Sequence, residues 1–145
     1  MSQQNVEVVR RAVETFNRGG VDACVSEGVW SPEIVWDVTP SGIPGLGAYR
    51  GHEEVRRFFK DDWFSAFPFE QWEVELEEVI DAGDDQVIGM SRQHGRGASS
   101  GAVTELELAQ IATVRDGQIV RVDNYLDREK ALEAAGLREG APPGG

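Results

Sequence analysis

Hydrophobic and polar positions in the first half of the chain follow a helical repeat. Apolar residues recur on one helix face over 5–16, and charged residues occupy the other face. Gly19-Gly20 follows the last turn, where glycine commonly ends a helix. The pattern therefore predicts a helix over 5–16, a second short helix over 21–29, and a third that begins near Gly51 and ends at Pro68.

Alternation with a period of two replaces the helical repeat further along. The segment 33–39 is rich in β-branched and aromatic residues and is predicted to be a short strand. The Gly/Pro-rich segment 40–48 is predicted to be a loop. Apolar and acidic residues alternate strictly over 71–76, which is typical of a strand with one buried face, and 86–95 and 103–115 are predicted to be further strands.

The strongest short-range signal is Asp116-Gly117, which separates two alternating runs. Both central positions of a two-residue hairpin turn prefer positive φ, so this pair predicts a hairpin. A short helix over 128–137 and a disordered tail over 138–145 are expected to follow. The chain is therefore predicted to be one α+β domain over 1–137, in which a hairpin sheet wraps around helices.

Composition and charge narrow the possible partners. The 145 residues are 40% hydrophobic and 28% charged, which is ordinary for a globular domain. No apolar run approaches the ~20 residues needed to span a bilayer, and the N-terminus lacks a signal-peptide pattern, so a cytoplasmic location is expected. The net charge of −12 argues against binding to nucleic acids or anionic membranes.

The chain offers few residues for redox or metal chemistry. Its one cysteine, Cys24, excludes an internal disulfide, and its apolar neighbours favour a buried, inert thiol. The two histidines lie far apart, and there is no Cys/His cluster with metal-ligand spacing. We therefore expect no metal site and no cofactor.

Three segments carry a resemblance to a known family. These are the run from Val9 to Gly19, the segment Tyr49–Val55, and the turn at 115–117 with Tyr125–Asp127 after it. With these three segments in this order, the chain resembles the SnoaL-like branch of the nuclear transport factor 2-like superfamily. The resemblance implies a cone-shaped, curved antiparallel sheet wrapped over three helices, with an apolar cavity and a homodimer formed through the outer sheet face. It does not imply one reaction, because relatives include isomerases, cyclases, epoxide hydrolases, dehydratases and proteins that only bind.

The first of three catalytic arrangements found in such relatives matches only in part. Ketosteroid isomerase-like enzymes use a carboxylate base, and Asp37 falls at the matching position, where neighbouring aromatic residues would raise its pKa. Ala12 stands where those enzymes carry tyrosine, and Gln110 stands where they carry a protonated aspartic acid. Steroid isomerase activity is therefore disfavoured.

The other two arrangements are also incomplete. SnoaL-type cyclases place an acid/base aspartate on the last strand, where this chain has Asn124; Asp123 lies on the opposite face unless the alignment shifts by one residue. Epoxide hydrolase relatives need an Asp-Arg-Asp arrangement. Arg92 and Asp37 could supply part of it, but no second inward aspartate is evident.

These considerations give a set of candidate site residues and three possible functions. Asp37 is the catalytic candidate, although it could equally cap a turn. The expected binding residues for a small apolar molecule are Trp36, Tyr49, Phe59, Trp63, Met90, Arg92, Gln110 and Asn124. The protein could be an isomerase- or cyclase-like enzyme in which Asp37 takes a proton next to a carbonyl while Gln110 and Asn124 hold the oxyanion. It could instead be a non-catalytic binding module, or a dimerisation domain with a vestigial pocket.

Overall fold

The fold is a six-stranded sheet with helices on both faces. The structure is a computed structural model that describes residues 2–64, 71–97 and 101–137. Its elements in chain order are α1 (Ser2–Ser26), β1 (Trp30–Asp37), η1 (Thr39–Ser41), β2 (Ala48–Arg50), α2 (Gly51–Arg57), η2 (Phe58–Trp63), β3 (Trp72–Gly83), β4 (Gln86–Arg96), β5 (Val103–Arg115), β6 (Gln118–Tyr125) and α3 (Arg128–Ala134).

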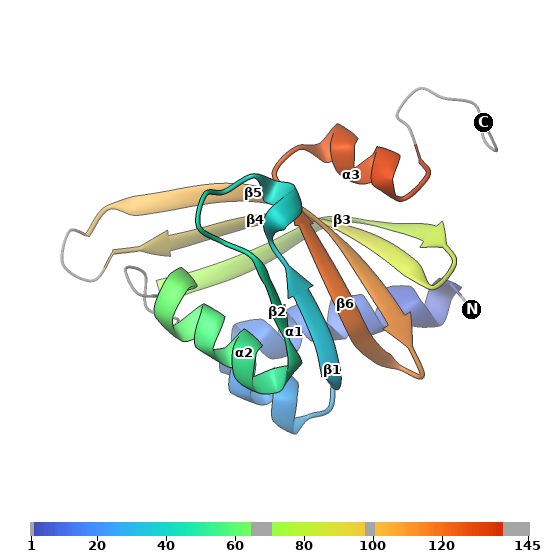
Figure 1. Cartoon of the computed structure of the whole chain (residues 1–145), viewed down its shortest axis with the longest axis horizontal. Helices are drawn as coiled ribbons and strands as arrows, with labels where there is room; N and C mark the ends of the chain where they lie inside the picture. The colour runs from blue at the N-terminus through green and yellow to red at the C-terminus, as the bar shows by residue number, and fades with distance from the viewer. Residues whose placement is uncertain (1, 65–70, 98–100, 138–145) are drawn as a thin grey trace.

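The strand order in the sheet is β2-β1-β6-β5-β4-β3. Strands β1 and β6 pair in parallel, whereas the other neighbouring strands are antiparallel. Helices α1 and α2 lie against one face of the curved sheet, and α3 lies against the opposite face (Figure 1). This arrangement confirms the predicted α+β cone with a short C-terminal helix.

The glycine break predicted in the first helical segment is present. Gly20 has φ 71° and ψ −157°, which kinks α1 into two helical parts, because this conformation is favourable only for glycine. The second part ends at Ser26 rather than at residue 29, and β1 starts at Trp30 rather than at 33. Strand β1 accommodates Pro32 because its pairing with β6 is irregular between Trp30 and Val35, where proline has no ladder hydrogen bond to donate.

The third helix begins at Gly51, as predicted, but changes its geometry after seven residues, about two turns. After α2 the chain continues as η2, a π-helix, and Phe64 N donates to Phe59 O at 2.7 Å, a bond that spans five residues. The predicted end of this helix at Pro68 and the predicted tail over 138–145 lie outside the described residues. The short strand β2 takes up the last residue of the predicted loop and the two residues that precede the helix.

The predicted hairpin turn is confirmed. Asp116 and Gly117 have φ values of 52° and 77° between β5 and β6, the two positive values that the turn requires. After β6, the Asp127 carboxylate caps α3 by accepting a hydrogen bond from Glu129 N at 2.8 Å. Helix α3 ends at Ala134, before the predicted residue 137, because Gly136 adopts φ 81°.

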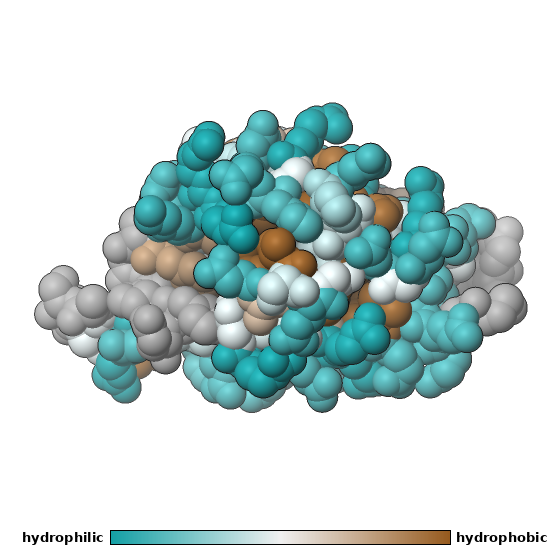
Figure 2. Space-filling model, turned by 90° about the horizontal axis from the view of Figure 1, so that it is seen from below, coloured by the Kyte–Doolittle hydropathy of each residue, from teal (hydrophilic) through white to brown (hydrophobic). Residues whose placement is uncertain are grey.

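Two hydrophobic clusters hold the layers together. The larger lies between the sheet, α1 and α2, and the smaller lies between the sheet and α3. Cys24 is fully buried in the larger cluster, and burial raises the pKa of its thiol to about 12, which confirms the predicted buried thiol. One face of the surface is largely hydrophilic, and apolar residues show through near its centre (Figure 2).

Asn17, within the first family-like segment, connects α1 to the edge strand β3. Its Nδ2 donates to Val74 O at 2.7 Å, and its Oδ1 accepts from Val74 N at 2.9 Å. Asn17→Ala removes both bonds and is expected to lower the free energy of unfolding by about 1–2 kcal/mol, measured by urea denaturation. The control is Asn5→Ala on the same helix, since Asn5 makes no such contact; equal losses in the two variants would show that the connection does not stabilise the fold.

Candidate cavity site

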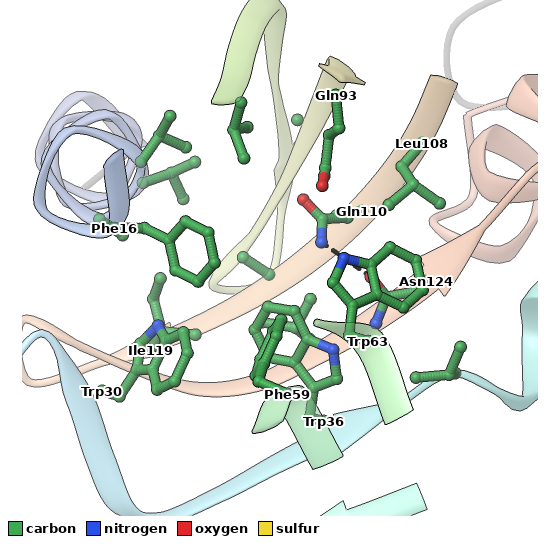
Figure 3. A pocket seen from close by; sticks show the side chains of 18 of the residues that line it. Phe16, Trp30, Trp36, Phe59, Trp63, Gln93, Leu108, Gln110, Ile119 and Asn124 are labelled. Atoms are coloured by element: carbon green, nitrogen blue, oxygen red, sulfur yellow. Dashed lines mark hydrogen bonds between the residues drawn. The ribbon is translucent and has the colours of Figure 1, made fainter. Parts of the chain in front are cut away.

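A cavity lies between α1, η2 and the concave face of the sheet (Figure 3). The free volume of the cavity, meaning the space that the centres of water molecules can occupy, is about 80 Å³. All the empty space between the lining atoms, counted with the crevices and the open mouth, is about 860 Å³. Each water needs about 10–15 Å³ of such free volume, so there is room for roughly five to eight waters or a molecule of similar size. The cavity therefore suits a molecule with one substituted aromatic ring.

Aromatic side chains from three elements form one wall of the cavity. They are Phe16 from α1, Trp30 and Trp36 from β1, and Phe58, Phe59 and Trp63 from η2. Ring centroids are 5.3 Å apart for Trp30–Trp36 and 5.1 Å apart for Trp36–Phe59. Such contacts fix the ring orientations, because aromatic pairs favour offset and edge-to-face packing. The wall thus presents flat apolar faces to any molecule inside.

Carboxamide side chains from three neighbouring strands provide the polar part of the lining. Gln93 comes from β4, Gln110 from β5 and Asn124 from β6. Gln110 Nε2 donates to Asn124 Oδ1 at 2.7 Å, and Asn124 Nδ2 donates to the backbone O of Asp37 at 3.0 Å. Gln93 Oε1 accepts from Trp72 Nε1 at 3.1 Å. One N–H of Gln110 Nε2 and one N–H of Asn124 Nδ2 are therefore already engaged with the protein.

The described part of this lining carries no charged side chain. Among the described residues that line the cavity, none carries an ionisable carboxylate, imidazole, amine or guanidinium group. Proton transfer by a side chain of the chain itself needs such a group within hydrogen-bond reach of the substrate. The described lining can bind and orient a molecule, but it offers no acid or base.

The structure places Asp37 outside the cavity, which corrects its predicted orientation. Its Oδ1 accepts from Thr39 N at 3.0 Å and from Thr39 Oγ1 at 2.7 Å, and its Oδ2 accepts from Arg121 Nη2 at 3.0 Å. Neighbouring residues of a strand face opposite sides of a sheet, and Trp36 points into the cavity. Asp37 therefore faces outward and caps a turn, the other role compatible with its sequence position.

An Asp-Arg-Asp group does exist, but on the outer face. Arg121 bridges Asp37 and Asp123, and its Nη2 lies 3.0 Å from a carboxylate oxygen of each. The pKa of Arg121 is raised, mainly by its hydrogen bond to Asp123. The pKa of Tyr125 is also raised, mainly by burial and to a lesser degree by the nearby carboxylates of Asp123 and Asp37. This group connects β1 to β6 on the face outside the cavity.

The remaining predicted site residues divide into two sets. Trp36, Phe59, Trp63, Gln110 and Asn124 line the cavity as predicted, whereas Tyr49, Met90 and Arg92 do not. Met90 packs in the cluster beneath α3, and Arg92 pairs on the outer face with Glu107 at 3.3 Å and Glu77 at 3.4 Å. Tyr49 stacks on Phe58 at 4.6 Å from behind the wall.

Gln93, the polar cavity residue on β4, was not among the site residues predicted from the sequence. Along this strand, Gly89 and Gln93 line the cavity, while Met90 and Arg92 face outward. The alternation was visible in the sequence, but both faces of β4 are largely buried. A strand with two buried faces gives no hydrophobic contrast to show which set of alternating residues faces the cavity.

The model of the SnoaL-like domain family matches residues 9–122. The chain belongs to this SnoaL-like family. No curated protein sequence matches it. The family membership agrees with the described fold.

Solved structures similar to this SnoaL-like protein share its fold. TerC, crystallised with polyporic acid, has a TM-score of 0.69 at 18% identity, covering 92% of this chain and 98% of TerC. A proposed SnoaL-like polyketide cyclase from Jannaschia sp. CCS1 has a TM-score of 0.67 at 22% identity, covering 97% and 95%. An NTF2-like protein from Burkholderia thailandensis E264 has a TM-score of 0.68 at 25% identity, covering 91% and 95%.

Within residues 2–64, 71–97 and 101–137, no helix is both long and apolar enough to cross a membrane. The same described ranges contain no group of three or more His, Cys, Asp or Glu side chains that could hold a metal ion.

Proposed function

We propose that this SnoaL-like protein binds a small, mostly apolar molecule of about one aromatic ring in its cavity, without using a side chain of its own as an acid or base. The observation that carries the proposal is the described lining, which combines an aromatic wall with the amides of Gln93, Gln110 and Asn124 and no ionisable group. Apolar walls with a few placed polar groups are the usual design of small-molecule sites.

The enzymatic alternative from the sequence has less support. Proton transfer by Asp37 would require its carboxylate in the cavity, but Thr39 and Arg121 hold it on the outer face. An oxyanion held by Gln110 and Asn124 would have only the second N–H of each amide, because the first already binds Asn124 Oδ1 or the backbone O of Asp37. The likeness to a proposed polyketide cyclase supports the class of small organic ligand rather than a reaction.

Ligand binding can be tested with the tryptophans of the chain. Trp30, Trp36 and Trp63, three of its four tryptophans, line the cavity. Titration with phenol, toluene and indole, followed by the indole N–H signals in ¹H–¹⁵N spectra, should shift these signals and raise Tm. Ligand at a hundredfold excess over Kd stabilises a protein by about 2.7 kcal/mol. Unchanged spectra and Tm with every compound would contradict the proposal.

A variant that fills the cavity should abolish binding. Ala112 is buried in β5 and lines the cavity, so Ala112→Leu adds three carbon atoms to the space that a ligand would occupy. We expect at least a tenfold rise in Kd, which is about 1.4 kcal/mol, measured by the same titration. The matched control is Thr113→Leu, which points to the opposite face of the same strand. Equal Kd values in the two variants would place the bound ligand outside the cavity.

The homodimer and the cytoplasmic location stay predictions, since the structure describes a single chain. Part of the outer sheet face, through which the family resemblance implies dimerisation, is covered by α3, which packs on Met90 and Ile111. Another part carries the charged pairs of Arg92 with Glu77 and Glu107. A dimer through this face would have to accommodate both features.

A further inference from the structure

We infer that the molecule bound in this cavity carries a hydrogen-bond donor on its ring, a hydroxyl or an N–H, which the side-chain oxygen of Gln110 accepts. This inference rests on the proposed function and specifies its ligand class. It depends on the direction of two hydrogen-bond chains, each fixed by a group that can only donate or only accept.

The first chain begins at the backbone of β1. The carbonyl of Asp37 can only accept, so the side-chain atom of Asn124 that lies 3.0 Å away must be Nδ2. Asn124 Oδ1 then faces Gln110, whose Nε2 donates to it at 2.7 Å. Turning the Gln110 amide over would set two oxygens against each other at that distance. The oxygen of Gln110 is therefore the free end of this chain.

The second chain fixes Gln93 in the same way. The indole N–H of Trp72 can only donate, so the atom of Gln93 that lies 3.1 Å from it must be Oε1. Gln93 Nε2 donates to Ser91 Oγ at 3.2 Å, and Ser91 Oγ donates to the backbone O of Leu108 at 3.5 Å. The Gln93 oxygen therefore cannot exchange places with its nitrogen without breaking this chain.

Both chains leave acceptors at the polar end of the cavity. The side-chain oxygens of Gln93 and Gln110 turn toward one another (Figure 3), and within the described part of the chain Gln110 Oε1 accepts no hydrogen bond. Gln110 is partly exposed, whereas Gln93 and Asn124 are 6% and 3% exposed. A molecule in the cavity thus meets the Gln110 oxygen first.

Two facing oxygens select for the chemistry of the ligand. A hydroxyl or N–H proton between them makes a favourable hydrogen bond, whereas a carbonyl, an ether oxygen or an ionised carboxylate meets like partial charge. The net charge of −12 adds to the penalty for an anion. The ligand class is therefore a neutral aromatic alcohol, phenol or N–H heteroaromatic compound rather than an enolate or a carboxylate.

Phenol and toluene test this inference because they have nearly the same shape and differ in the donor. In Gln110→Met, an apolar residue of similar length replaces the acceptor. We expect the phenol-to-toluene affinity ratio to fall at least about fivefold relative to the unmodified protein, with toluene affinity within about twofold. The ratio is obtained by titration followed in ¹H–¹⁵N spectra. Gln86→Met, the same substitution at the end of β4 away from the cavity lining, should leave the ratio unchanged.

The outcomes separate this inference from the proposed function. A ratio that is the same in Gln110→Met and the unmodified protein overturns the donor requirement while ligand binding stands. Absence of binding by both probes overturns the proposed function and this inference with it. If Gln110→Met does not fold, the unmodified protein decides: phenol but not toluene should shift the side-chain amide signals of Gln93 and Gln110, and equal shifts overturn the inference.

Discussion

Gly95→Ala is expected to lower the free energy of unfolding by about 3 kcal/mol or more, which is the upper end of the losses that overpacking of a protein core causes. Gly95 pairs with Trp72 across the β3–β4 ladder. A Cβ at this position would clash with Trp72 Cε3, and it would lie 2.8 Å from Trp72 Cζ3 and 3.2 Å from the backbone O of Gln71. The ring cannot yield freely, because it packs edge-on against Trp63 with centroids 5.9 Å apart and donates to Gln93.

Urea denaturation of Gly95→Ala and Gly47→Ala provides the measurement and its control. A Cβ at Gly47 meets no atom within 4 Å, and its φ is not in the left-handed region, so this variant should keep its stability within about 0.5 kcal/mol. The Gly95 variant should also lose the downfield position of the Trp72 indole N–H signal, as its bond to Gln93 breaks. Similar stability losses in the two variants would show that the Trp72 ring can move at little cost.

Local chemistry allowed most of the fold to be predicted. Glycine in the left-handed region was predictable at Gly20 and Gly117, because side chains are strained there, and both positions mark the expected breaks. The strand around Pro32 was not predictable in this way. A proline in a strand is tolerated only where the ladder is irregular, and that irregularity depends on the register with β6, far along the chain.

The site could be predicted only as far as strand alternation allowed. Trp36 and Asp37 were both assigned to the cavity, although adjacent residues of a strand point to opposite faces. Burial decides which one is inside, and Trp36 takes the inner position because its ring completes the aromatic wall with Phe59. On β4, hydrophobicity favoured Met90, but α3 provides a second apolar environment on the outer face, so Gln93 was missed.

Asn124→Asp is expected to be destabilised by about 2–4 kcal/mol at pH 7 and much less at pH 4. Asn124 is 3% exposed, and its two polar atoms face Gln110 Nε2 and the backbone O of Asp37. A protonated carboxyl group can reproduce both contacts, since its O–H donates to the carbonyl. An ionised one would set an oxygen against that carbonyl at about 3 Å, so burial and this contact both raise the pKa of the introduced group.

The sign of the pH dependence follows from that raised pKa. The unfolded variant loses the proton of the introduced carboxyl group near pH 3.9, whereas the folded variant keeps this proton to higher pH. The stability of the variant relative to the unmodified protein therefore falls as pH rises from about 4, by up to about 1.4 kcal/mol per pH unit. Urea denaturation at pH 4 to 8 measures this loss. Asn5→Asp, near the start of α1, is the control; its carboxylate favours the helix N-terminus, so it should show a small dependence of opposite sign. A pH-independent loss in Asn124→Asp would mean that the carboxylate reaches water through the cavity, and the apolar enclosure proposed for the ligand would then be wrong.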